Sequence, residues 1–430
     1  MNTIAKASAG EGAGANSTGR VLFASLAGTT IEFFDFYIYA TAAVLVFPRL
    51  FFPGSDPTVG ILQSLATFAL AFLARPVGSA LFGHFGDRIG RKATLVAALL
   101  TMGVSTVAIG LLPTYASIGV AAPVLLALCR LGQGLGLGGE WGGAVLLATE
   151  NAPPGKRAWF GMFPQLGAPL GFFVATATFL LLTATMNDSA FFAWGWRLPF
   201  LGSAVLVLTG LWIRLSINET PAFREMIERQ QRVRLPISEV IARHPRALLA
   251  GTMASIATFL VFYLVSVFAL SWGTTQLGYS RPQFLWLEMI AVLLFSSTIP
   301  LSARIAGRYG SRNAMLLATS AILVFGLVFA RLFVAGSLPA IFVFLAIGMS
   351  LTGLTYGPVG TLLAGMFPTA VRYTGASLCF NLSGILGASL APYIATWLAT
   401  RHGLAYVGYY LSAAALLTLL ALLTVRSDHA

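Results

Sequence analysis

Two carboxylic acids and a phenol share one face of the first apolar segment of the chain. Within residues 21–47, Gly28, Glu32, Asp35 and Tyr39 follow one another at helical spacing. A carboxylate inside a membrane is costly unless a cation lies beside it, so its protonation follows its surroundings. We therefore predict that at least one of Glu32 and Asp35 takes part in proton coupling, with Asp35 the preferred residue. The alternative for either acid is a permanent ion pair with an arginine.

Two arginines also lie inside apolar segments. Arg130 is followed one turn later by Gln133, and Arg75 lies in an earlier segment. The planar guanidinium group donates hydrogen bonds in a fork that suits a carboxylate of a side chain or a substrate. We expect Arg130 to serve both proton coupling and substrate binding, and Arg75 to bind substrate. For each, a structural ion pair with the acids of the first segment is the alternative.

Glu140 lies seven residues beyond Gln133, on the same helix face. It is predicted either as a further proton-coupling residue or as a structural partner of an arginine. Polar aromatic and amide side chains in other apolar segments complete the predicted substrate site, with helix packing as their alternative role. The predicted substrate-binding residues are Tyr37, Tyr39, Arg75, Arg130, Gln133, Trp141, Gln165, Tyr263, Tyr356 and Asn381.

Twelve apolar runs must position these side chains. Each is close to the ~20 residues that a helix needs to cross the hydrocarbon of a bilayer. They cover residues 21–47, 58–82, 92–112, 118–148, 158–185, 196–217, 247–273, 284–303, 312–332, 338–365, 373–398 and 404–425. The pattern predicts an all-α integral membrane protein with twelve transmembrane helices.

The composition agrees with a membrane protein and excludes a soluble one. Of the 430 residues, 57% are hydrophobic and 9% are charged, against ~25% charged residues in soluble domains. If both termini and the connections after even-numbered runs share one side, that side holds 19 of the 26 Lys and Arg residues and the other holds five. This excess predicts that both termini are cytoplasmic. It also accounts for the net charge of +12 without a nucleic-acid partner.

An internal repeat predicts two pseudo-symmetric halves of six helices each. Gly90 and Gly310 occupy corresponding positions in two short basic loops, and Arg157 and Arg372 precede corresponding runs. The expected divisions are a disordered N-terminus (1–19), a first half (20–217), a linker with a short helix (218–246), a second half (247–426) and a tail (427–430). Such repeats indicate a transporter with its substrate site between the halves.

Several motifs resemble those of a known family. The loop Asp87-Arg88-x-Gly90-Arg91-Lys92 is similar to the signature of the major facilitator superfamily. Glu32-Phe-Phe-Asp35, Gly139-Glu140-Trp141-Gly142-Gly143 and Phe367-Pro368-x-x-x-Arg372 resemble the metabolite:proton symporter family of bacteria, whose members carry shikimate, 2-oxoglutarate, citrate, or proline and betaine. The resemblance implies alternating access in the cytoplasmic (inner) membrane. The second-half loop departs from the signature at Gly307 and Ser311, so the first-half loop is expected to dominate gating.

The predicted function is proton-driven uptake of a small polar metabolite, most simply an organic acid, by a monomer that is not an enzyme. The proton is the coupling ion, and neither cofactor nor metal is expected. Alternatives are a proline or betaine symporter, a drug/proton antiporter, and a receptor derived from a transporter. The predicted gating residues are Asp87, Arg88, Arg91, Lys92, Glu150, Arg157, Arg308 and Arg372.

Overall fold

The computed structural model describes residues 18–54, 56–89, 91–150, 152–153, 155–216, 236–334, 337–368 and 371–425. Throughout these ranges the chain forms helices joined by short turns. Residues 1–17 of the predicted disordered N-terminus and residues 218–235 of the predicted linker lie outside the described ranges. Thr18 and Gly19, also predicted to be disordered, belong instead to the first helix.

The first half of the molecule contains six membrane-crossing segments and several short helices. Its helices are α1 (Thr18–Leu45), α2 (Phe47–Leu50), α3 (Pro57–Ile89), α4 (Arg91–Leu111), α5 (Tyr115–Ile118), α6 (Ala121–Gly138), α7 (Trp141–Glu150), α8 (Arg157–Thr185), α9 (Asp188–Ala193), η1 (Gly195–Arg197) and α10 (Leu198–Ser216). Here α6 and α7 together make the fourth crossing segment, which is interrupted between Gly138 and Trp141.

The second half begins after a short amphipathic helix, α12 (Pro236–Arg243). It contains α13 (Pro245–Tyr263), η2 (Leu264–Phe268), α14 (Ala269–Thr275), α15 (Arg281–Tyr309), α16 (Ser311–Leu332), α17 (Leu338–Gly365), α18 (Arg372–Gly384), η4 (Ile385–Ser389), α19 (Ala391–His402) and α20 (Leu404–Thr424). The π-helical turns η2 and η4 interrupt two crossing segments, and such turns recur at functional sites.

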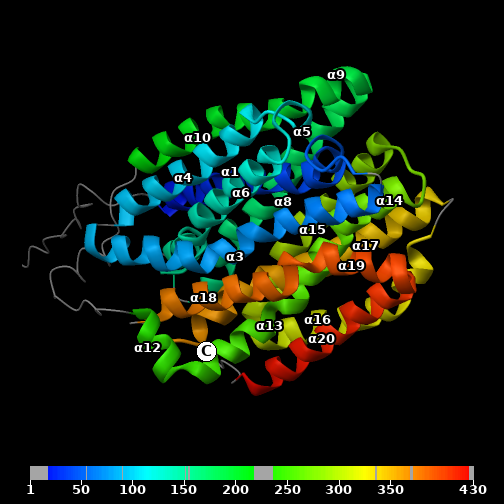
Figure 1. Cartoon of the computed structure of the whole chain (residues 1–430). Coiled ribbons are helices and arrows are strands. Elements are labelled where there is room, and N and C mark those ends of the chain that lie inside the picture. The colour runs from blue at the N-terminus through cyan, green and yellow to red at the C-terminus, as the bar shows by residue number, and fades with distance from the viewer. Residues whose placement is uncertain are drawn as a thin grey trace, which may run out of the picture.

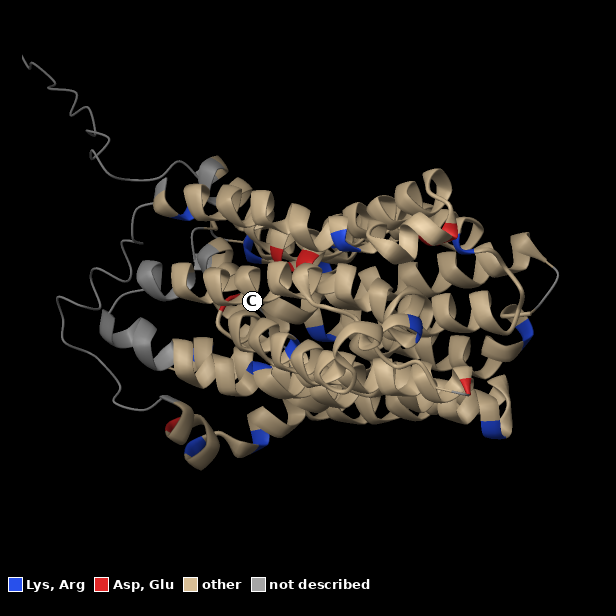
Figure 2. Cartoon of the chain, turned by 45° about the horizontal axis from the view of Figure 1, so that its top comes forward, with Lys and Arg blue, Asp and Glu red and all other residues tan. Residues whose placement is uncertain are grey.

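The helices are long and apolar enough to span a membrane. Within the described ranges, ten stretches meet this condition. Two further helices, α1 with its buried charges and α4 with the apolar stretch Val96–Leu111, complete the predicted twelve. Figure 2 shows an almost uniformly uncharged bundle with few Lys, Arg, Asp or Glu residues inside it. The chain is therefore a multi-pass membrane protein.

The two halves lie side by side and meet along several helices (Figure 1). Helix α8 of the first half packs against α15 and α17 of the second, and α3 packs against α18 and η4. The end of the bundle that carries α12 and the end of α20 is called the linker end below. The opposite end, which carries α9, is called the α9 end (Figure 1).

The two loops that carry the internal repeat are shorter than the sequence suggested. Helix α3 continues to Ile89 and α4 begins at Arg91. In the second half, Gly310 separates α15 from α16 with a φ of +86°. Glycine adopts this conformation without the strain that a side chain would cause.

The glycines of α6 let this helix approach α3 closely. A Cβ atom at Gly134 would collide with the backbone of Ala71, and one at Gly138 would collide with the backbone of Arg75. Small residues at such spacing are typical of close helix contacts in membranes. The approach fixes Arg130 and Arg75, which lie on these two helices, in one region of the first half.

Candidate substrate and proton site

Arg214 joins three segments of the first half through two acids. Its guanidinium group contacts both carboxylate oxygens of Glu140, at 2.5 and 3.0 Å, and Oε1 of Glu32 at 3.2 Å. The side chains of Glu32 and Glu140 are buried, and that of Arg214 is 15% exposed. Sequence reasoning counted Arg214 among the loop cations, although it falls inside the predicted span 196–217. The structure thus gives Glu140 the structural arginine partner that was one of its two predicted roles.

Asp35 lies one turn further along α1 and has a different environment. Its carboxyl group is fully buried, and the Ser203 hydroxyl donates to its Oδ1 at 2.5 Å. The Thr106 hydroxyl lies beside the same carboxyl group. Oδ2 has no hydrogen-bond partner among the described residues, and no cation of these residues pairs with Asp35. Sequence reasoning missed Ser203 and Thr106, since single hydroxyl residues in apolar helices carry no distinctive signal.

Arg130 connects to Asp35 through a short chain of hydrogen bonds. Its Nη1 donates to Gln133 at 2.9 Å, and the Gln133 amide donates to Thr106 at 2.8 Å. The guanidinium group is fully buried and lies 4.1 Å from the ring centroid of Tyr39. Two side chains, Gln133 and Thr106, thus link the Arg130 guanidinium group to the Asp35 carboxyl group.

Arg75 occupies the adjoining region, among aromatic rings. Its guanidinium carbon lies 4.6 Å from the ring centroid of Phe36 and 4.5 Å from that of Phe72. The same Phe36 ring lies 4.3 Å from the guanidinium carbon of Arg130, so one ring separates the two cations. Three predicted residues from both halves, Tyr37, Tyr263 and Tyr356, interact electrostatically with Arg75.

Neither of these buried arginines is neutralised within the described part of the chain. No described carboxylate forms an ion pair with Arg75 or Arg130. Nε of Arg75 and Nη2 of Arg130 also lack hydrogen-bond acceptors there. The alternative in which the acids of α1 consume these cations is thus not realised, because Glu32 pairs with Arg214 and Asp35 with Ser203. Two positive charges, each with a hydrogen-bond donor that lacks an acceptor among the described residues, thus remain in this region.

Three further predicted residues close this region toward the linker end. The Trp141 indole donates to Gln165 at 3.0 Å, and the Gln165 amide donates to the carbonyl oxygen of Tyr356 at 2.9 Å. The Trp141 ring stacks on Phe380 of the second half with centroids 3.7 Å apart. Phe380 in turn contacts the Tyr356 ring. The site is thus bounded toward the linker end by residues of both halves.

Asn381 is the predicted substrate residue that lies apart from this cluster. It donates to the Ser79 hydroxyl at 2.9 Å, and Ser79 donates to the carbonyl oxygen of Gly138. Tyr373 donates to the carbonyl oxygen of Gly139 at 3.1 Å. These contacts join α18 to α3 and to the end of α6, so in this conformation they hold the halves together near the linker end.

The predicted gating residues are only partly described. Arg372 donates to the carbonyl oxygen of Phe367, Arg308 lies over the ring of Tyr309, and Arg157 is exposed at the start of α8. The side chains of the remaining five lie outside the described part of the structure: Asp87, Arg88, Arg91, Lys92 and Glu150. A gating role for these residues stays a prediction.

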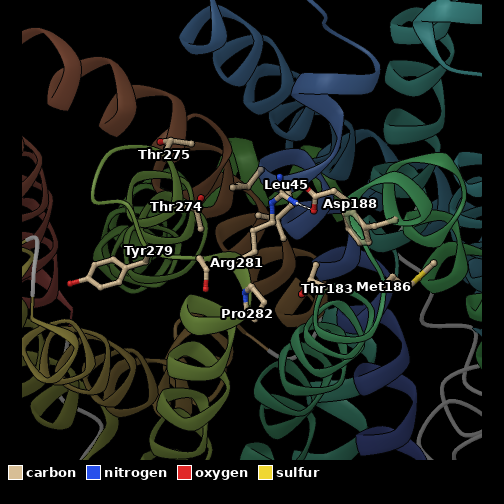
Figure 3. Close-up of a pocket in the computed structure, with 12 residues that line it drawn as sticks. Leu45, Thr183, Met186, Asp188, Thr274, Thr275, Tyr279, Arg281 and Pro282 are labelled. Carbon is tan, nitrogen blue, oxygen red and sulfur yellow. Dashed lines mark hydrogen bonds and ion pairs between the residues drawn. The ribbon is translucent and has the colours of Figure 1, made fainter.

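A pocket of about 400 Å³ lies at the α9 end, between the halves. Thr183 and Asp188 of the first half and Arg281 of the second line it. Figure 3 shows Arg281 and Asp188 pointing toward each other across the pocket, with Nη1 and Oδ1 3.1 Å apart. The two residues follow separate crossing segments and carry no motif, so the sequence did not reveal this pair.

Comparisons with known proteins agree with this architecture. Residues 20–234 match the family model described as "Sugar (and other) transporter". The "Inner membrane metabolite transport protein YhjE" of Escherichia coli (strain K12) is 57% identical over 419 residues, which cover 96% of this chain and 95% of that protein. The "Shikimate transporter" of the same strain is 35% identical over 418 residues, with 95% of each chain covered.

The solved structures give the same fold. A crystal structure of a D-xylose-proton symporter superimposes with a TM-score of 0.72 at 17% sequence identity, covering 95% of this chain and 97% of that chain. At this identity the match concerns the fold of twelve helices in two halves. Together with the metabolite transport proteins that it resembles along nearly its whole length, the chain belongs to the major facilitator superfamily and is a membrane transporter rather than an enzyme.

Proposed function

We propose that the protein is a proton-coupled symporter that carries a small organic acid across the bacterial inner membrane. The observation that supports this most is the pair of buried arginines, Arg75 and Arg130, which lack a carboxylate partner among the described residues. A buried cation is costly unless an anion or several acceptors satisfy it. An organic anion supplies both, through charge-assisted hydrogen bonds.

The surroundings of Arg75 suit a carboxylate attached to a hydroxylated or ring-shaped body. The Tyr37, Tyr263 and Tyr356 side chains lie near Arg75, and the Tyr356 hydroxyl has no hydrogen-bond partner among the described residues. Rings supply apolar contact, and phenol groups supply orientation. The shikimate transporter, a hydroxy-acid carrier by its name, is a relative along almost the whole chain, which favours the same chemical class here.

Asp35 has the environment that proton coupling requires. It is buried, and no cation of the described residues neutralises it. A carboxyl group in such a setting holds a proton until a cation or water approaches. A substrate anion that draws on Arg130 changes the Arg130–Gln133–Thr106 chain beside Asp35. Substrate binding and proton binding are thereby coupled.

The proposed direction of transport is inward, with the linker end facing the cytoplasm. The excess of Lys and Arg in the connections at that end supports this orientation. The gradient across the inner membrane then drives protons, and with them the substrate, from the α9 end to the linker end. A drug/proton antiporter of the same fold would instead expel its substrate.

Proteoliposomes with an inward-directed proton gradient test this proposal. Labelled shikimate or a related hydroxy acid should accumulate above its external concentration, and a proton-conducting uncoupler should abolish the accumulation. Asp35→Asn should lose uphill accumulation while it still exchanges substrate at equal concentrations. Expulsion of the label, or normal accumulation by both Asp35→Asn and Glu32→Gln, would contradict the proposal.

A zwitterion such as betaine is the second candidate cargo. The rings around the site, Phe36, Phe72 and Tyr263 among them, suit a quaternary ammonium group. These rings already contact the guanidinium groups or each other, and the free arginine donors still require an acceptor. The organic acid therefore remains the favoured substrate.

A further inference from the structure

A third buried carboxyl group lies in the second half, where the proposed mechanism does not use it. Glu288 is 2% exposed, and its Oε1 has no hydrogen-bond partner among the described residues. None of the ion pairs of the described residues includes it. Carboxyl groups inside membrane segments are costly and are rarely kept without a role.

The register of two antiparallel helices places Glu288 at the interface between the halves. Helix α15 contacts α8 along its length, from Arg304 over the Trp159 ring near the linker end to the Arg281–Asp188 pair at the α9 end. Because the two helices are antiparallel, each step back along α15 corresponds to a step forward along α8. Counted from the Arg304–Trp159 contact, Glu288 lies at the level of residue 175 of α8, and counted from the Arg281–Asp188 pair it lies at the level of residue 181. The buried polar residue of α8 between these two levels is Thr176, whose hydroxyl also lacks a partner among the described residues.

This level lies directly below the pocket at the α9 end. Arg281 and Thr183 line that pocket. Glu288 lies two helical turns from Arg281 on α15, and Thr176 lies two turns from Thr183 on α8, in both cases toward the linker end. At 1.5 Å per residue this is about 10 Å. Figure 3 shows Arg281 and Thr183 at the pocket. Two buried polar side chains, each with an oxygen that lacks a hydrogen-bond partner among the described residues, therefore lie below the pocket on these two helices, although neither lines it.

The helices packed against α15 offer no other charge to Glu288. Helix α14 has no titratable residue, α17 has only Tyr356, which lies deeper beside Phe295, and α8 has only Arg157 at the linker end. On α16, Arg331 reaches the level of Glu288 but is exposed. The remaining titratable residues of α15 and α16 are the paired Arg281 and a group at the linker end: Arg304, Arg308, Tyr309 and Arg312.

We propose that Glu288 is a second proton-binding residue of the carrier, reached from the α9-end pocket along the interface of α8 and α15. With the halves in contact, its surroundings are apolar and favour the neutral acid. When the halves part at the α9 end, water reaches the carboxyl group, and it exchanges its proton with that side. The inference rests on the proposed function, since a second proton site serves a proton-driven carrier.

Infrared spectroscopy of the purified protein tests the site without a transport assay. The difference spectrum between acid and alkaline pH should contain the C=O stretching band of a buried protonated carboxyl group that Glu288→Gln loses. The matched control is Glu239→Gln on α12, whose carboxylate contacts only the exposed Arg243 among the described partners, and it should keep the band. A Glu288→Gln spectrum identical to that of the wild type would overturn the proposal.

A second measurement uses the wild-type protein and therefore does not depend on the folding of a variant. Dicyclohexylcarbodiimide reacts with protonated carboxyl groups in apolar surroundings, and mass spectrometry locates the modified residue. Glu288 should be modified, with a yield that falls as the pH rises. Absence of modification at Glu288 across the pH range would contradict the proposal.

Transport assays separate this inference from the proposed function. Glu288→Gln should lower the number of protons moved per substrate and remove one step from the pH dependence of uptake, whereas Asp35→Asn should remove another. If the wild type shows no proton-driven uptake, the proposed function fails while the infrared result for Glu288 stands. If the wild type is proton-driven and Glu288→Gln has an unchanged proton ratio, the second site fails alone.

Discussion

At the residue scale, the roles proposed for the buried arginines and acids depend on which of these charges are already paired. Arg214 satisfies Glu32 and Glu140, whereas Arg75 and Arg130 have aromatic and amide neighbours but no described carboxylate partner. A charge with a permanent partner fixes helices, and a charge without one is available for a ligand. By this distinction Glu32 and Glu140 have a structural role, and Arg75 and Arg130 are the proposed substrate-binding residues.

Replacing Arg75 should weaken substrate binding. Arg75→Gln removes the charge from the hydrogen bonding to the carboxylate; the loss of one charge-assisted hydrogen bond, about 1.5–3 kcal/mol, should lower the apparent affinity for the organic acid by about 10- to 100-fold. Arg75→Lys keeps the charge and should recover only part of the loss, because the forked geometry is gone. Isothermal titration calorimetry measures both.

The control for this prediction is Arg331→Gln, which removes an exposed cation from the end of α16. Its substrate affinity should equal that of the wild type. An Arg75→Gln protein that also binds the acid with wild-type affinity would show that the carboxylate is held elsewhere.

The cluster around Arg214 should be a stability element. Glu140→Gln breaks a two-point ion pair, a change that costs about 3–5 kcal/mol at fully buried sites and less here, since Arg214 reaches solvent. The melting temperature should fall most for Glu140→Gln, less for Glu32→Gln with its single contact, and least for Asp35→Asn. A reversed order would make Asp35 the structural acid and reopen proton coupling at Glu140.

At the element scale, helix contacts mediated by glycine should be sensitive to a single methyl group. Gly134→Ala places a Cβ against the Ala71 backbone of α3, and overpacking of this kind costs about 1–3 kcal/mol. Gly202→Ala in α10 is the matched control, because nothing lies within 4 Å of its added Cβ. Gly202→Ala should leave the melting temperature unchanged or raise it, whereas Gly134→Ala should lower it. Equal effects at the two positions would contradict the close α3–α6 contact.

The sequence predicted the elements well and their interruptions poorly. Apolar runs locate helices because hydrocarbon requires them, and the predicted run 338–365 coincides with α17 (Leu338–Gly365). The π turn within 247–273 was not visible, since η2 is as apolar as its flanks. The same holds for the candidate site: Arg75, Arg130 and the acids of α1 were predicted from the cost of a charge inside a membrane, whereas Arg214 was counted as a loop cation. The pairing of these charges depended on helix rotation, which periodicity alone does not fix.

At the scale of the whole molecule, contacts near both ends hold the halves together in this conformation. Tyr373 and Asn381 bind the first half near the linker end, and Arg281 binds Asp188 at the α9 end. Alternating access requires that one set opens at a time. The exposed Arg281–Asp188 pair contributes only about 0–1 kcal/mol, so it is suited to frequent opening.

Cross-linking at the α9 end should stop the transport cycle. Cysteines at positions 188 and 281, joined by a short thiol-cleavable reagent after replacement of Cys129 and Cys379, should block substrate uptake in proteoliposomes. Cleavage of the cross-link by a thiol should restore substrate uptake. Continued uptake by the fully cross-linked protein would mean that the halves do not part at this end.

Arg75 and Arg130, a buried pair without a carboxylate partner among the described residues, are proposed to recognise the carboxylate of the substrate. Calorimetric titration of the purified transporter with shikimate and with its uncharged methyl ester tests this most directly, because the two ligands differ only at the acid. The acid should bind, and the ester should bind at least about ten-fold more weakly, the equivalent of one charge-assisted hydrogen bond. Equal affinity for the two ligands, or binding of betaine with no binding of any organic acid, would contradict it.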